Sequence, residues 1–127
     1  MARILVVEDN ALNIKLFCDL LAAHGHQPEA VTDSRTAFDR ARAFAPDLII
    51  TDIQLPHISG LELIRRYRED DSLSDVPIMA VTAYAAAGDE DRIRSAGAQA
   101  YVSKPISVAR FVEEVTALLE RKEPVPN

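Results

Sequence analysis

The sequence predicts an α/β protein with five parallel strands in one sheet and helices on both of its faces. Short apolar runs at 4–7, 47–52 and 77–82 are bounded by turn signals, which is typical of strands buried on both faces. Segments with apolar residues at helical spacing separate these runs. Strands that alternate with helices indicate a parallel sheet with right-handed crossovers.

The composition fits one globular domain and argues against several classes of protein. The chain has 127 residues, 48% of them hydrophobic, and a net charge of −6. That charge disfavours nucleic acid and anionic membranes as partners. The single cysteine, Cys18, cannot form an internal disulfide, which fits a reducing cytoplasm. No apolar run is long enough for a signal peptide or a membrane span, so we expect a cytoplasmic protein.

The first predicted unit is the strand at 4–7 and the helix that follows it. Asn10 is placed to cap this helix, which stops near Gly25. The helix carries the apolar residues Leu12, Leu16, Phe17, Leu20 and Leu21.

The second unit is a weak strand at 27–31 and a helix that Asp33 or Ser34 can cap. The helix stops before Pro46. The remaining elements are a strand at 47–52, a helix opened by the capping-box match Ser59-Gly60-Leu61-Glu62, a strand at 77–82, a short helix through Ile93 to Gly97, a strand at 100–103 and a helix capped by Ser107. The small residues at 83–88 predict mobile backbone. We expect one domain over 1–122, a short tail at 123–127 and no output domain.

Several of the predicted strands end in residues that carry chemistry. Glu8 and Asp9 follow the first strand, Asp52 ends the third, Thr82 ends the fourth and Lys104 follows the fifth. In a parallel sheet these carboxyl ends share one edge, where open α/β folds place their ligands. Residues far apart in the sequence are therefore expected to meet there.

Three carboxylates at one edge need positive charge nearby. Two like charges about 4 Å apart repel by roughly 4 kcal/mol at an effective dielectric constant of 20. Lys104 supplies one positive charge, and a divalent cation would supply two more. Carboxylates with water and phosphate oxygens suit Mg²⁺, and Mn²⁺ would also fit.

This set of groups suits phosphoryl transfer to a carboxylate. A carboxylate can attack phosphorus and form an aspartyl phosphate, and the protein mainly has to position groups and neutralise charge. The spacing proposes Asp52 as the acceptor, with Asp9 and Glu8 holding the metal. Lys104 would be a counter-charge, and the Thr82 hydroxyl would donate to the phosphoryl group.

Four motifs in this order also resemble the receiver domain of bacterial two-component response regulators. They are Val7-Glu8-Asp9-Asn10, Thr51-Asp52-Ile53-Gln54-Leu55-Pro56 with Gly60, Val81-Thr82-Ala83 and Ser103-Lys104-Pro105. The resemblance covers essentially the whole chain and implies a flavodoxin-like receiver fold with strand order 2-1-3-4-5. Short runs around these motifs are also similar to a single-domain member that regulates cell division.

The resemblance implies a role for each group near the acceptor. Asp52 corresponds to the phosphorylated aspartate. Asp9, Asp52 and the backbone carbonyl of Gln54 correspond to Mg²⁺ ligands, with Glu8 acting mainly through water. Gln54 and Tyr84 occupy positions that control water access in the family.

The resemblance also implies a conformational switch. Thr82 and Tyr101 correspond to a pair in which the hydroxyl moves to the phosphoryl group and the ring turns inward. The Lys104–Pro105 peptide bond corresponds to one that is cis in the family, at a cost of about 0.5–1 kcal/mol. Residues expected on the output face are Arg94, Tyr101, Ile106 and Arg110.

The implied function is a phosphorylation switch rather than an enzyme. A sensor histidine kinase, which can also act as phosphatase, or a histidine phosphotransfer protein would exchange the phosphoryl group. Output would pass through contacts with a downstream protein, and we expect a monomer. A phosphorelay intermediate remains an alternative. An aspartyl-phosphate phosphatase would need a second acid at Gln54, and a flavodoxin-like cofactor binder would need a different loop from Glu8-Asp9-Asn10.

Taken singly, most of these residues also fit ordinary structural roles. Asp52 alone would fit a strand-end acid, Thr82 a β-branched strand residue and Tyr101 a half-buried ring. His57 fits a loop exterior and Cys18 fits helix packing. Only the whole set of residues, lying together at one edge of the sheet, indicates a site.

Overall fold

The computed structural model, which describes residues 2–83 and 88–120, contains one five-stranded parallel sheet. Its strand order is β2-β1-β3-β4-β5, and this confirms the predicted fold class. The strands are β1 (Arg3–Val7), β2 (Gln27–Val31), β3 (Leu48–Asp52), β4 (Ile78–Thr82) and β5 (Ala100–Ser103).

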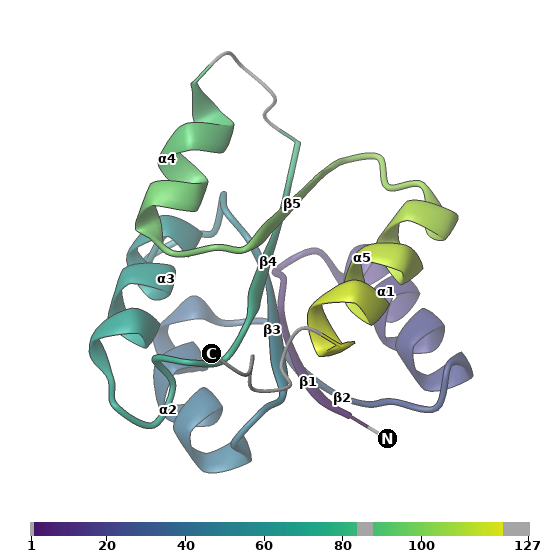
Figure 1. The fold of residues 1–127 in the computed structure, drawn as a ribbon, viewed down its shortest axis with the longest axis horizontal. Helices are drawn as coiled ribbons and strands as arrows, with labels where there is room; N and C mark the ends of the chain where they lie inside the picture. The colour runs from purple at the N-terminus through teal and green to yellow at the C-terminus, as the bar shows by residue number, and fades with distance from the viewer. Residues whose placement is uncertain (1, 84–87, 121–127) are drawn as a thin grey trace, which may run out of the picture.

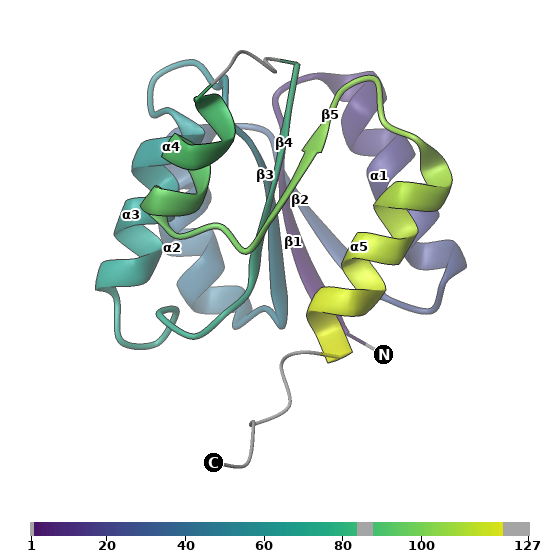
Figure 2. The same ribbon diagram turned by 45° about the horizontal axis from the view of Figure 1, so that its top comes forward.

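Five helices in the described part of the chain cover the two faces of the sheet (Figures 1 and 2). They are α1 (Ala11–Ala23), α2 (Ser34–Phe44), α3 (Gly60–Glu69), α4 (Asp89–Ala96) and α5 (Val108–Glu120). Helices α1 and α5 pack on one face, and α2, α3 and α4 pack on the other. None of the helices within the described residues is both long and apolar enough to cross a bilayer.

The core consists of two layers, one on each side of the sheet. Successive side chains of a strand point to opposite faces. Leu5 and Ile49 therefore join the layer under α2, α3 and α4, whereas Val6 and Ile50 join the layer under α1 and α5. This burial on both faces explains why β1, β3 and β4 read as continuous apolar runs rather than alternating ones.

Side-chain caps fix where the helices begin. Asn10 Oδ1 accepts from the backbone N of Asn13, and Ser59 Oγ accepts from the backbone N of Glu62. At α2 the cap is Asp33, while Ser34 is the first helical residue. The sequence allowed either residue as the cap of this helix, and the structure shows that it is Asp33.

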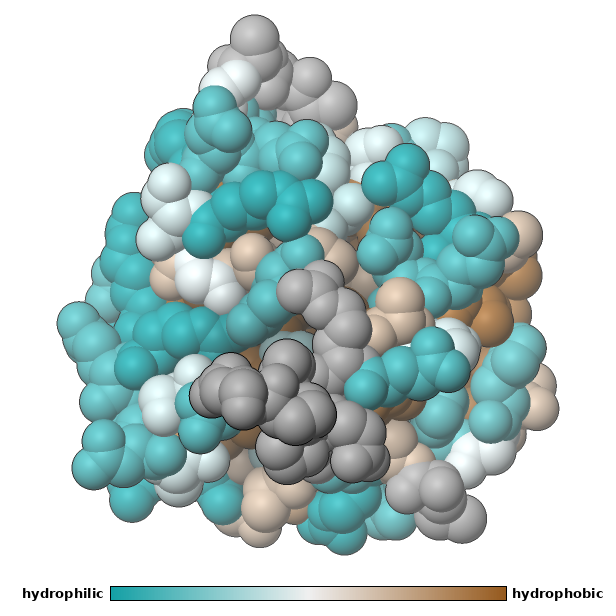
Figure 3. All heavy atoms as spheres, viewed as in Figure 1, coloured by the Kyte–Doolittle hydropathy of each residue, from teal (hydrophilic) through white to brown (hydrophobic). Residues whose placement is uncertain are grey.

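Two of the apolar residues that the sequence places on α1 lie outside its buried side. Leu12 is 80% exposed and Leu16 is 40% exposed, whereas Phe17 and Leu21 are buried. The buried side contains residues at helical spacing from Ile14, so Leu12 and Leu16 lie outside it. Figure 3 shows a mostly hydrophilic surface with an apolar area on the right, the side on which α1 lies in Figure 1.

Some expectations fall outside the described residues. The expected mobile segment at 83–88 includes residues 84–87, and with them Tyr84. The expected tail at 123–127 is outside as well.

Candidate functional site

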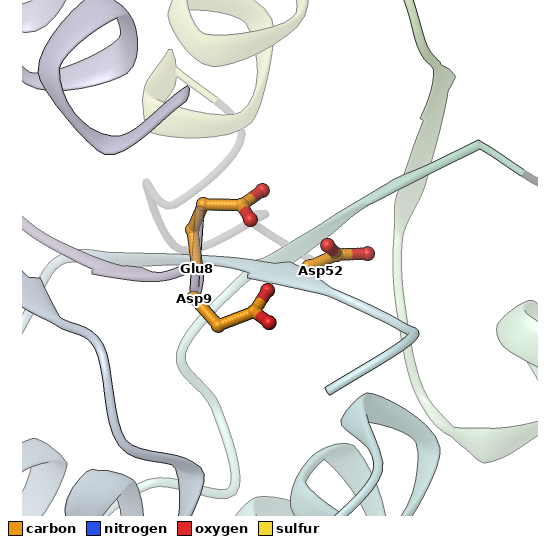
Figure 4. Close-up of side chains that lie close together, drawn as sticks. All are labelled: Glu8, Asp9 and Asp52. Atoms are coloured by element: carbon orange, nitrogen blue, oxygen red, sulfur yellow. The ribbon is translucent and has the colours of Figure 1, made fainter. Parts of the chain in front are cut away.

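The carboxyl ends of β1 and β3 bring three carboxylates together. Glu8 and Asp9 follow β1 directly, and Asp52 is the last residue of β3. These strands are neighbours in register, with Val7 opposite Thr51. Each of the three acids offers a carboxylate oxygen, and these oxygens all lie within 4.8 Å of one another (Figure 4). The convergence expected at this edge is present.

Lys104 joins this cluster from the loop after β5. Its Nζ donates to Glu8 Oε1 at 2.8 Å and to Asp52 Oδ2 at 2.9 Å. The backbone N of Lys104 donates to the carbonyl of Thr82 at 2.8 Å, which fixes the start of the loop against β4. The Lys104–Pro105 peptide bond is cis.

The charges of the cluster do not balance. Glu8 is 1% and Asp52 6% exposed, so both carboxylates have little water to screen them. Burial by itself would lower the pKa of Lys104, but its hydrogen bonds to Glu8 and Asp52 outweigh burial and raise that pKa. Lys104 therefore remains an ammonium at neutral pH, and it is one positive group beside three acidic side chains. Burial raises the pKa of one of these, Glu8, although the hydrogen bond from Lys104 opposes that rise. The all-oxygen donor set and the surplus negative charge fit a divalent cation such as Mg²⁺.

Glu8 has a more direct role in the cluster than the sequence indicated. One of its oxygens accepts from Lys104, and the other accepts from the backbone N of Asn10 at 3.0 Å. Both oxygens thus have protein partners, and Glu8 holds Lys104 toward Asp52. Spacing along the chain could not reveal this pair, because the two residues are 96 positions apart.

The loop between β3 and α3 folds back tightly on Asp52. The backbone N of Gln54 donates to Asp52 Oδ1 at 3.1 Å, and the N of Gly60 donates to the carbonyl of Ile53 at 2.9 Å. A Cβ on Gly60 would lie 2.1 Å from the carbonyl oxygen of Asp52, so only glycine fits there. This loop contains the Gln54 carbonyl that the resemblance implied as a metal ligand.

The expected switch residues lie on β4, which neighbours β3, and on β5, which follows β4 at the edge of the sheet. Thr82 is buried at the end of β4, one residue beyond the partner of Asp52 in the register. Tyr101 is half-buried on β5, opposite Ala80. A cavity of about 340 Å³ lies between Leu61 of α3 and Ile93 of α4 and reaches Thr82.

The residues expected on the output face lie around β5. Arg94 donates to the carbonyl of Gln99 at 2.9 Å, and Arg110 donates to the carbonyl of Tyr101 at 3.5 Å. Ile106 is half-buried and follows the cis bond. Arg94, Tyr101 and Arg110 lie on α4, β5 and α5, and Ile106 lies in the loop between β5 and α5. We call the exposed parts of these three elements and of that loop the α4–β5–α5 surface.

Three further residues had no predicted role at the site: His57, Cys18 and Ser34. His57 is exposed, and Cys18 is half-buried on α1, where burial raises the pKa of its thiol. Ser34 is buried and reaches the β3–α3 loop, 22 positions away at Pro56. The sequence offered Ser34 only as a possible cap, since nothing local marks a long-range contact.

Known proteins share both the sequence and the fold of this chain. The family model described as "Response regulator receiver domain" matches residues 4–116. The "Polar-differentiation response regulator DivK" of Brucella anthropi is 50% identical over 116 residues, which cover 91% of this chain and 94% of that protein. The protein of the same name from Brucella ovis is 49% identical over the same shares.

Solved structures agree with this relationship. The receiver domain of a sensor histidine kinase from Pseudomonas aeruginosa, with a magnesium ion coordinated in its active-site cleft, is 30% identical with a TM-score of 0.86 and covers 94% of this chain and 98% of that one. A structure described as a putative response regulator from Chloroflexus aurantiacus is 26% identical with a TM-score of 0.90 and covers the same shares. The chain belongs to the response regulator receiver domain family.

Proposed function

We propose that this protein is a phosphorylation switch in which Asp52 accepts a phosphoryl group from the phosphohistidine of a sensor histidine kinase. The observation that carries the proposal is the contact of the Lys104 ammonium with Asp52, beside two further carboxylates. This arrangement pairs the acceptor carboxylate with positive charge at the place where a phosphoryl group would arrive.

Each residue of the site has its own role in the transfer of the phosphoryl group. As the N–P bond of the phosphohistidine breaks, an Asp52 carboxylate oxygen forms the new O–P bond, and the imidazole leaves with the electron pair. Lys104 donates to one phosphoryl oxygen and the Thr82 hydroxyl donates to another. Glu8 keeps the ammonium in place, since it accepts from the same Nζ at 2.8 Å.

A divalent cation completes the site. Asp9, Asp52 and the backbone carbonyl of Gln54 would hold Mg²⁺, with Glu8 acting through water, and Mn²⁺ would also serve. When bound, the cation neutralises charge on the transferring group. The magnesium ion in the Pseudomonas aeruginosa receiver domain supports this assignment.

Phosphorylation would change affinity for a partner protein. Thr82 moves toward the phosphoryl group, Tyr101 turns inward, and the α4–β5–α5 surface is altered. The protein would act as a monomer in the bacterial cytoplasm, as a phosphoacceptor rather than an enzyme with a separate substrate. The Brucella relatives are named polar-differentiation response regulators, which supports a role in polar differentiation. Control of the cell cycle or of cell division is the finer role that the sequence resemblance implies. A phosphorelay intermediate would use the same chemistry and pass the group to a histidine phosphotransfer protein.

Intact mass measurement tests the proposal directly. The protein is incubated with acetyl phosphate and Mg²⁺, and Asp52→Asn is treated in parallel. We expect the parent to gain one phosphoryl group, the variant to gain none, and chelation of the metal to abolish the gain. Equal labelling of the two proteins would reject Asp52 as the acceptor.

The phosphatase alternative predicts a different result. With a generic phosphate ester in excess, a phosphatase would release phosphate over many turnovers. The residue two positions after Asp52 is Gln54, which cannot act as the acid that such an enzyme uses. We expect no sustained release of phosphate from such esters.

A further inference from the structure

Ser34 links α2 to the loop that follows the acceptor aspartate. The side chain is 2% exposed, and its Oγ donates to the carbonyl of Pro56 at 2.5 Å. The same oxygen accepts from the backbone N of Ile58 at 3.1 Å. One hydroxyl therefore contacts the backbone on both sides of His57.

The backbone between these two contacts has an unfavourable conformation. His57 has a φ of +74°, and the N of Ile58 also donates to the carbonyl of Pro56 at 2.9 Å. These are features of the less common, strained kind of γ-turn. A non-glycine residue stays in such a conformation only when its surroundings hold it there. Ser34 supplies that restraint from a different helix.

Helix α2 does not need the Ser34 hydroxyl for its own capping. Asp33 is the N-cap, and its carboxylate accepts from the backbone N of Arg35 at 2.9 Å. Thr36 adds a hydrogen bond from its Oγ1 to the carbonyl of Asp33. The two hydrogen bonds of Ser34 Oγ go to the loop instead.

We propose that Ser34 is a positioning residue that sets the affinity of the site for Mg²⁺. This inference rests on the proposed function, in which the backbone carbonyl of Gln54 is a metal ligand. The loop is fixed at its start by the hydrogen bond from Gln54 N to Asp52 and at its end by the one from Gly60 N to Ile53. Ser34 fixes the middle of the loop. Because Mg²⁺ requires near-ideal octahedral geometry, a loop that loses this restraint binds it less well.

Isothermal titration of Mg²⁺ into the full chain tests the inference, with Ser34→Ala compared with the parent. We expect Ser34→Ala to raise the Kd for Mg²⁺ by about tenfold, the low end of outer-shell effects on metal sites. Ser34→Thr keeps the hydroxyl and should bring the Kd back to within about twofold of the parent. Thr36→Ala is the matched control, since it removes a hydroxyl from the same helical turn without touching the loop, and its Kd should equal that of the parent.

Melting temperatures in chelator separate positioning from general stability. Variants with equal melting temperatures but different Kd values support a positioning role. An unchanged Kd in Ser34→Ala, with the parent still binding Mg²⁺, would overturn the inference and leave the proposed function intact. An equal loss of affinity in Thr36→Ala would also overturn it, because the effect would then come from α2 as a whole. A parent that binds no Mg²⁺ would reject the metal site itself, and this inference with it.

Discussion

At the scale of single residues, His57 is a position where the chain tolerates strain. Its φ of +74° is unusual for a residue with a side chain. Glycine adopts this conformation without steric cost, although it loses more entropy on folding. We expect His57→Gly to raise the free energy of unfolding by about 1 kcal/mol, since the strain relieved is about 1–3 kcal/mol. Urea denaturation measures this, and a loss of stability would show that the imidazole makes a favourable contact.

The hydroxyl of Tyr67 is buried without a hydrogen-bond partner among the described residues. Its ring is fully buried and stacks on Phe38 with centroids 6.2 Å apart. The Tyr67 hydroxyl has no hydrogen-bond partner in the described structure, and burial raises its pKa well above the usual value. Tyr67→Phe removes the unpaired group and keeps the ring. Thermal denaturation should therefore show a gain of about 1 kcal/mol, and a loss would mean that the hydroxyl is satisfied in solution.

At the scale of elements, the sequence predicted the strands better than the buried sides of the helices. The strands were located to within about one residue because burial on both faces leaves a dense apolar run between turn residues. In α1, apolar residues occur around most of the helix, so the pattern could not tell Leu12 and Leu16 from the residues that face the sheet. Which side packs depends on the neighbouring helix α5, where Phe111 stacks on Phe17.

Arg68, near the end of α3, connects three segments at the amino ends of the strands, which is the end of the sheet opposite the site. Its guanidinium donates to the carbonyls of Ser74, Val76 and Gly97 and to Gln99 Oε1, at 2.8–3.0 Å. Lysine has too few donors in the wrong geometry to replace this set. In chemical denaturation we expect Arg68→Ala to cost about 3 kcal/mol of stability and Arg68→Lys about 2 kcal/mol, because several partly buried carbonyls lose their partner.

A neighbouring arginine on α3 provides the control for this prediction. Arg66 pairs with Glu62 at the surface, at 3.3 Å. Arg66→Ala should change stability by less than about 0.5 kcal/mol in the same chemical denaturation experiment. If Arg68→Ala were equally mild, its carbonyl contacts would not contribute to folding.

At the scale of the whole molecule, the sequence could locate the site but not its internal contacts. Parallel strands end at one edge, so the convergence of Asp9, Asp52 and Lys104 followed from the alternation of strands and helices. The pairing of Glu8 with Lys104 could not be predicted from this alternation. The hydrogen bond from Ser34 to the β3–α3 loop could not be predicted from it either. Both depend on side-chain directions that only the assembled layers determine.

The convergence of three acids at this edge predicts that Asp9 favours Mg²⁺ binding but lowers the stability of the metal-free protein. Asp9 contributes a carboxylate to a cluster in which one ammonium faces three acids. Asp9→Asn removes one repelling charge. The variant should therefore be more stable than the parent in chelator, by about 0.5 kcal/mol after allowing for solvent screening at this exposed position. A ligand that binds only the folded state stabilises it by about 1.4 kcal/mol at ten times its Kd.

Millimolar Mg²⁺ should reverse this order. The parent is expected to gain stability with Mg²⁺, and Asp9→Asn should gain far less because a proposed ligand is missing. Glu113→Gln on α5 removes the same charge at an exposed position outside the cluster, so it should keep the full response to Mg²⁺. Melting temperatures of the three proteins in chelator and in Mg²⁺ measure both effects. If Asp9→Asn were less stable in chelator, or responded to Mg²⁺ as the parent does, repulsion among these acids would not be what draws the cation to this edge.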